Sequence, residues 1–211
     1  MNLSPIRRGV QARLDAKSRA REAAIANTRQ AIRRAANAIR SAHRGELEAA
    51  DRLLLEVRDL LNVAESVLAA YPDVYYAGFL QDAQKEYAEA RATRALVAGE
   101  PVPAPEELAV GDAPYLNGLA EVIGELRRHL LDVLRAGDVN RATELFEAME
   151  EIHSLLADID QPDAITGGLR RSTDIARAVI ERTRSDLTLT VIQRDLADAL
   201  RRTEESDGRS G

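Results

Sequence analysis

The chain has no cysteine among its 211 residues, which excludes disulfide bonds, thiolate metal sites and cysteine nucleophiles. Aromatic residues make up only 3% of the sequence, a composition more typical of packed helices than of sheets. No apolar run reaches the ~18 residues that a membrane-spanning helix needs, and the N-terminus lacks the apolar core of a secretory signal. We therefore expect a cytoplasmic protein with no membrane partner.

Several catalytic signatures are also missing. There is no Gly-x-x-x-x-Gly-Lys-Ser/Thr loop for nucleotide phosphates and no Gly-x-Ser-x-Gly elbow for a serine nucleophile. One Glu-x-x-His pair occurs, Glu150 with His153, whereas a di-iron bundle needs two such pairs and two further glutamates. We interpret His43, His129 and His153 as surface or helix-end residues.

What the sequence does contain is helix-forming residues, chiefly Ala, Leu and Arg, with 45% apolar and 30% charged residues overall. Apolar residues recur at helical spacing, and turn residues separate the segments. On the first helix, Ile25, Ile32 and Ile39 recur every seven residues with Ala35 and Ala42 beside them, which predicts a narrow apolar seam suited to close packing. We predict an all-α protein, one domain over residues 1–211, built from six to seven long helices, with 204–211 as a disordered polar tail. The expected helices span 8–43, 46–70, 74–98, 114–136, 139–159 and 169–203, and a proline-rich loop covers 99–105.

Charge is unevenly distributed along the chain. Residues 1–45 carry eleven basic and two acidic side chains, a net +9, so the remainder carries −15 and the sum is −6. A basic segment on an acidic body indicates a polyanion partner such as nucleic acid. The same pattern also fits a solvated helix face or a basic helix that docks on acidic neighbours or on another subunit.

Four glutamates form two pairs at helical spacing, Glu86 with Glu89 and Glu121 with Glu125. Each pair falls on one face of its expected helix, so two packed helices can bring four carboxylates together. Carboxylates gathered in this way need a compensating charge, for which a divalent metal is suited. The alternative is ordinary solvation or ion pairing, with Lys85 reaching Glu89 and with Arg128 or His129 reaching Glu125, and the residues alone leave this open.

The segment 115–128, Tyr-Leu-Asn-Gly-Leu-Ala-Glu-Val-Ile-Gly-Glu-Leu-Arg-Arg, resembles the signature of the translin family. That signature runs Tyr-Leu-x-Gly, then Glu-Leu seven residues after the glycine, then Arg. Ala-Gly-Asp at 136–138 is similar to the turn that follows in the family, and 38–45 is similar to the end of its first helix. The resemblance covers nearly the whole chain and is sharpest over 115–138.

Within the family, the chain is most similar to the catalytic branch of translin-associated factor X. That branch has Gln-Glu-Tyr-x-Glu-Ala on its third helix, where this chain has Lys85 followed by Glu86-Tyr87-Ala88-Glu89-Ala90. The branch also has Asp and Glu four residues apart on the fourth helix, matched here by Glu121 and Glu125. Two positions depart from the pattern, since Glu121 replaces Asp and Lys85 replaces Gln.

The resemblance implies a metal-dependent endoribonuclease that acts on single-stranded RNA, with single-stranded RNA or DNA as its binding partner and Mg²⁺ or Mn²⁺ as its cofactor. It also implies a seven-helix fold that assembles into a hollow homo-octamer. The candidate catalytic and metal-binding residues are Glu86, Glu89, Glu121 and Glu125. The candidate residues for holding the RNA backbone are Arg29, Arg33, Arg34 and Arg40. Two alternatives remain: a non-catalytic scaffold that binds single-stranded RNA or DNA, and a purely structural helical assembly whose basic segment is an interface.

Overall fold

The structure is a computed structural model that describes the backbone of residues 2–207 and the side chains of residues 2–202. This part of the chain is helical and contains no β-strand, which confirms the predicted all-α class. The long helices are α1 (Ser4–His43), α2 (Leu47–Leu68), α4 (Phe79–Ala98), α6 (Asp112–Arg135), α7 (Val139–Ala157) and α9 (Leu169–Asp207). Between them lie three single turns, α3 (Pro72–Tyr75), α5 (Pro105–Leu108) and α8 (Asp163–Thr166).

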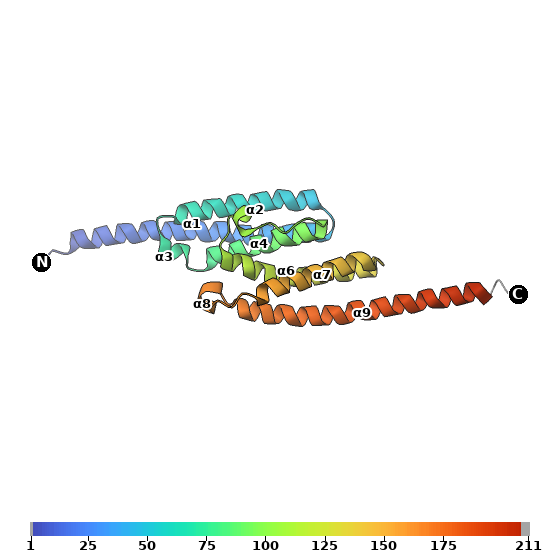
Figure 1. Cartoon of the computed structure of the whole chain (residues 1–211). Coiled ribbons are helices and arrows are strands. Elements are labelled where there is room, and N and C mark those ends of the chain that lie inside the picture. The colour runs from blue at the N-terminus through green and yellow to red at the C-terminus, as the bar shows by residue number, and fades with distance from the viewer. Residues whose placement is uncertain (1, 208–211) are drawn as a thin grey trace.

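The helices pack as two groups that share α4 and α6 as their common boundary (Figure 1). In the first group, α1 and α2 form an antiparallel pair that packs against α4. In the second, α6 packs against α7 and α9. Each group has its own cluster of buried apolar residues, and α4 lies against α6 where the two groups meet.

Alanines form most of the buried seam of α1, which includes the predicted Ala35, Ile39 and Ala42. Ala24, Ala31, Ala35, Ala38 and Ala42 are fully buried, whereas among the isoleucines only Ile39 is buried and those at 25 and 32 are half-exposed. A methyl side chain lets neighbouring backbones approach closely, so α2 can insert a leucine-rich face into the seam. The buried residues of that face are Leu54, Val57, Leu61 and Leu68.

The helix boundaries follow the turn residues, with some differences from the prediction. Tyr71 is non-helical, at φ −132° and ψ 70°, because Pro72 follows it, and the chain then makes the extra turn α3. The Asp138 carboxylate caps α7 by accepting a hydrogen bond from the backbone of Arg141 at 3.0 Å, as expected.

The outer limits of the chain correct two expectations. α1 begins at Ser4, four residues earlier than predicted. α9 continues to Asp207, so the start of the expected polar tail is helical, and residues 208–211 of that tail lie outside the described residues. Among residues 2–207 no helix is both long and apolar enough to cross a bilayer.

Candidate functional site

Helix α4 presents the first glutamate pair from an unusually buried position. It packs against α1, α2 and α6, so most of its residues between Tyr87 and Ala95 are buried. Glu89 lies on this buried surface with only 7% of its area exposed, while Glu86, one turn earlier, is half-buried. A glutamate this deeply buried normally has a cationic partner. Within the described residues, the Glu89 carboxylate forms no ion pair.

Gly118 brings the second pair close to the first. It lies on α6 directly against α4, where an added Cβ would stand 2.7 Å from the carbonyl oxygen of Lys85 and 3.1 Å from the backbone nitrogen of Glu89. Only a residue without a side chain permits this approach of the two backbones. Glu121 follows Gly118 by three residues, so it emerges on the same side of α6, beside the α4 glutamates.

Three of the four predicted glutamates meet at this crossing. One carboxylate oxygen from each of Glu86, Glu89 and Glu121 lies within 4.8 Å of the others, a spacing that suits a shared metal ion. Lys85 partly neutralises the group, because its ammonium lies 2.5 Å from Glu121 and 3.3 Å from Glu86. Lys85 was expected to reach Glu89 and instead bridges the two helices. We call Glu86, Glu89 and Glu121 the glutamate centre.

The electrostatics of the centre are dominated by Glu89. Burial, followed by the negative charges of Glu121, Glu86 and Glu125, raises the pKa of Glu89 to about 8, and Lys85 offsets only part of this effect. Burial lowers the pKa of Lys85, but its hydrogen bond to Glu121 and the nearby carboxylates outweigh this and raise it overall. The centre therefore has too little positive charge to keep all of its carboxylates ionised near neutral pH.

Glu125 lies beside the centre but is bonded elsewhere. Its Oε2 is 2.6 Å from Nε2 of His43, at the end of α1, and the His43 side chain is only 6% exposed. This hydrogen bond lowers the pKa of Glu125 despite its burial. His129, one turn further along α6, lies with its ring 5.7 Å from that of His43, and burial together with His43 lowers its pKa.

The hydrogen-bond partner of Glu125 is His43, which the sequence did not suggest, although the charge of the suggested Arg128 also lowers the pKa of Glu125. The His43 side chain is buried and hydrogen-bonded to Glu125. The ring of His129 lies against that of His43 and not against Glu125. The sequence analysis thus missed the role of His43 and assigned Lys85 to the wrong partner. The signal for His43 was weak, because it lies 82 residues from Glu125 and no local pattern connects them.

Solved structures resemble the chain over most of its length. The structure of AfC3PO in complex with duplex RNA superimposes with a TM-score of 0.82 and 33% sequence identity, covering 89% of this chain and 97% of that chain. A crystal structure of AfC3PO gives a TM-score of 0.80 and 32% identity over the same shares. The chain belongs to the translin/Trax-type C3PO family.

A third solved structure resembles the chain in fold, and one further protein resembles it in sequence. Apo-NeC3PO has a TM-score of 0.75 at 21% identity, covering 90% of this chain and 97% of that one, a likeness of fold alone. The uncharacterized protein MJ0175 of Methanocaldococcus jannaschii is 28% identical over 195 residues, covering 89% of this chain and 84% of its own length. No protein-family profile matches the sequence.

The four arginines predicted to hold RNA lie on α1 of this C3PO-family chain, on two different sides of the helix. Arg29, Arg33 and Arg40 are exposed and, at spacings of four and seven residues, share one face. Arg40 lies one turn before His43, so this face leads along α1 towards the glutamate centre. Arg34 points to the other side, where its Nε is 3.0 Å from Glu56 of α2.

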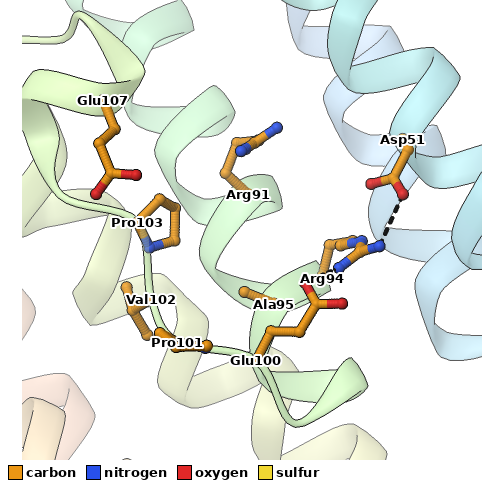
Figure 2. A pocket seen from close by; sticks show the side chains of 9 residues that line it. All are labelled: Asp51, Arg91, Arg94, Ala95, Glu100, Pro101, Val102, Pro103 and Glu107. Atoms are coloured by element: carbon orange, nitrogen blue, oxygen red, sulfur yellow. Dashed lines mark hydrogen bonds and ion pairs between the residues drawn. The ribbon is translucent and has the colours of Figure 1, made fainter.

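A separate polar pocket is lined by residues of α2, α4 and the loop that follows α4, and its charged side chains pair with one another (Figure 2). Arg94 lies 2.7 Å from Asp51 of α2 and also pairs with Glu100 of the loop after α4. Glu107 and Arg91 complete its charged lining, which therefore holds three acids and two bases. This balance does not favour a phosphate, so in this member of the C3PO family the glutamate centre is the better candidate for chemistry.

Proposed function

We propose that the chain is a metal-dependent endoribonuclease that hydrolyses phosphodiester bonds of single-stranded RNA at the glutamate centre, with Glu125 beside it. The observation that carries this proposal is the meeting of three carboxylates within 4.8 Å around a buried Glu89 that has no ion pair of its own within the described residues. Membership of the C3PO family supports an RNA-binding or nuclease role, and AfC3PO itself forms a complex with duplex RNA.

The donor set fits Mg²⁺ or Mn²⁺. Glu86, Glu89 and Glu121 offer only carboxylate oxygens, the ligands that these hard ions prefer. The raised pKa of Glu89 is a second sign of fit, because it reflects uncompensated negative charge that a divalent ion would relieve. When bound, such an ion supplies positive charge to a phosphate group and makes a water molecule more acidic.

The protein's own residues would orient the reaction. His43 holds the carboxylate of Glu125 in one direction through its hydrogen bond, which also keeps that carboxylate ionised. Glu89 and Glu121 are the two candidates for a general base, a role open to whichever of them does not bind the metal. Arg29, Arg33 and Arg40 would hold the RNA backbone through sequence-independent phosphate contacts. We further propose that the active form is a homo-oligomer, an octamer by the family resemblance.

The test is cleavage of labelled single-stranded RNA by the purified protein in Mg²⁺ or Mn²⁺, with EDTA as the metal-free arm. Glu89→Gln keeps the shape of the side chain but removes its charge, and it should abolish cleavage while RNA binding persists. The matched control is Glu48→Gln, an exposed glutamate on α2 that should cleave like the parent protein. Cleavage by Glu89→Gln at the parent rate would refute the assignment of the centre.

One observation favours a non-catalytic RNA-binding scaffold as the second candidate. Lys85 already neutralises Glu86 and Glu121, as a structural charge cluster would require. A scaffold would bind RNA in a strongly salt-dependent way without cutting it, with or without metal. Replacing Arg29 or Arg33 by Gln should reduce the slope of log affinity against log salt by about 0.7 for each phosphate contact that is lost on a single strand.

A further inference from the structure

Lysine is rare in this chain. Of its 29 basic residues two are lysines, Lys17 and Lys85, and the other 27 are arginines. Lys17 lies on α1, where its ammonium is 2.7 Å from Asp73 of α3. Lys85 lies at the glutamate centre. A protein that otherwise uses arginine for positive charge thus places a lysine where its carboxylates gather.

Lys85 bridges the two helices that form the centre. Its ammonium lies 2.5 Å from Glu121 of α6 and 3.3 Å from Glu86 of α4. The side chain is 22% exposed, so water screens this charge only in part. The backbone of Lys85 lies at the crossing itself, because its carbonyl oxygen faces Gly118. The ammonium therefore stands between carboxylates of both helices.

A position between carboxylates of two elements is one that a divalent ion takes in a two-metal nuclease site. In such sites the two ions lie about 3.5–4 Å apart and stabilise the attacking and the leaving oxygen. An ammonium is a compact point charge with three N–H donors, whereas a guanidinium is a broad planar fork. Lys85 is thus the basic side chain whose shape comes closest to that of a bound cation.

Glu89 provides for one metal ion in addition to the ammonium. Its side chain is more than nine-tenths buried, and within the described residues it forms no ion pair, not even with Lys85. One of its oxygens nevertheless lies within 4.8 Å of oxygens of Glu86 and Glu121. Each carboxylate has two oxygens, so Glu86 and Glu121 can face Lys85 with one oxygen and a metal ion with the other.

The charges lead to the same count of metal ions. With all carboxylates ionised, the three glutamates of the centre and the neighbouring Glu125 carry −4, and Lys85 reduces this to −3. One divalent ion then leaves −1, and a second ion would reverse the sign to +1. Without Lys85, two divalent ions would balance the four carboxylates.

We propose that Lys85 takes the place of a second metal ion, so that the centre works with one divalent ion and one ammonium. This inference rests on the proposed ribonuclease function, to which it adds the number of metal ions and the role of Lys85. The ammonium has three N–H groups and faces two carboxylates, which leaves one N–H group for a phosphate oxygen of the RNA.

The test counts the Mn²⁺ ions that each chain binds, by equilibrium dialysis and metal analysis at saturating Mn²⁺. We expect one ion per chain for the parent protein. Lys85→Gln removes the ammonium and should bind two ions per chain. Lys17→Gln removes the other lysine, at a distance from the centre, and should bind one ion like the parent protein. Circular dichroism checks that both variants remain helical.

Electron paramagnetic resonance of the same samples gives a second readout. A single Mn²⁺ in each centre gives the spectrum of an isolated ion, whereas two ions about 3.5–4 Å apart couple magnetically. We expect the isolated spectrum for the parent protein and for Lys17→Gln, and a coupled spectrum for Lys85→Gln.

Three results would overturn the proposal. Two coupled ions in the parent protein would mean that Lys85 moves aside for the second ion. A single ion in Lys85→Gln would mean that the lysine holds no metal position. A parent protein that binds no Mn²⁺ would exclude any metal at the centre.

RNA cleavage by the same samples separates this inference from the proposed function. A parent protein that cleaves RNA with two bound ions would keep its ribonuclease function, and the role of Lys85 would be refuted. A parent protein that binds one ion, gains a second in Lys85→Gln and cleaves no RNA would support the role of Lys85 as a stand-in for a metal ion, and the ribonuclease function would be refuted.

Discussion

The close approach of α4 and α6 at Gly118 leads to a sharp prediction about stability. Replacing Gly118 by Ala puts a Cβ 2.7 Å from the Lys85 carbonyl oxygen and 3.1 Å from the Glu89 nitrogen, both backbone atoms that cannot move independently. The two helices must therefore separate by a few tenths of an ångström. Such overpacking lowers the free energy of unfolding by about 1–3 kcal/mol, while the better helix propensity of alanine raises it by about 1 kcal/mol.

Gly124 provides a matched control on the same helix. It is exposed, and a Cβ added there would meet no atom within 4 Å. Gly124→Ala should therefore gain the propensity term of about 1 kcal/mol without the steric cost. The difference between the two variants isolates the packing cost, and we expect it to be about 2 kcal/mol in favour of Gly124→Ala.

The measurement is thermal and urea unfolding of both variants beside the parent protein. For a chain of about 200 residues, a difference of 2 kcal/mol separates the melting temperatures by about 4–8 °C. Gly118→Ala should also bind Mn²⁺ more weakly, because its glutamates move apart. If Gly118→Ala melts at or above the temperature of Gly124→Ala, the close crossing of α4 and α6 is not a feature of the protein in solution.

Three further predictions concern charges at the site. Since burial raises the folded-state pKa of Glu89 to about 8, well above its value in the unfolded chain, this group costs stability as pH rises from about 4.5 towards 8. Without metal, Glu89→Gln should thus be more stable than the parent by about 3 kcal/mol at pH 7 and equal to it near pH 4.5, as measured by urea unfolding. Lys85→Gln removes the ammonium that competes for Glu121, so Mn²⁺ measured by titration calorimetry should bind about 5-fold more tightly. His43→Ala leaves Glu125 without its hydrogen bond and should cost about 2 kcal/mol on unfolding, with His43→Gln recovering part of it.

Each of these predictions has an opposite result that would count against it. A parent protein whose stability does not fall between pH 4.5 and 8 would mean that Glu89 is compensated in solution. Weaker Mn²⁺ binding by Lys85→Gln would mean that the lysine supports the metal site rather than competing with it. An unchanged unfolding free energy for His43→Ala would mean that the contact with Glu125 is not maintained.

The sequence predicted the elements of the fold well because the helix signals are local. Pro72, the loop after α4 and the Asp138 cap each define a boundary through their own backbone chemistry. The seam of α1 was predicted only in part, through Ala35, Ile39 and Ala42. Its isoleucines recur every seven residues, yet the alanines between them are the fully buried positions, because they allow α2 to come close. Apolar periodicity identifies the buried side of a helix, but the size of the side chains decides which residues lie deepest.

The glutamate pairs were predictable in type but not in partners. Helical spacing places Glu86 with Glu89 and Glu121 with Glu125 on common faces, and three of these four meet at one point. The direction of Glu125 depends instead on where the end of α1 lies, since His43 is 82 residues away in sequence. Long-range packing of this kind leaves no trace in local spacing, so neither His43 nor the bridging role of Lys85 could be derived from it.

The balance of charge argues that the centre is more than a structural feature. Ion pairs buried in a core are frequently no more stabilising than apolar residues of the same size, and Glu89 lacks even a pair within the described residues. The raised pKa of Glu89 is a direct expression of that cost. Lys85 supplies one positive charge to three carboxylates, from a flexible side chain that can swing away. With all carboxylates ionised, the three glutamates and Lys85 sum to −2, so a divalent ion would bring the net charge of the centre to zero.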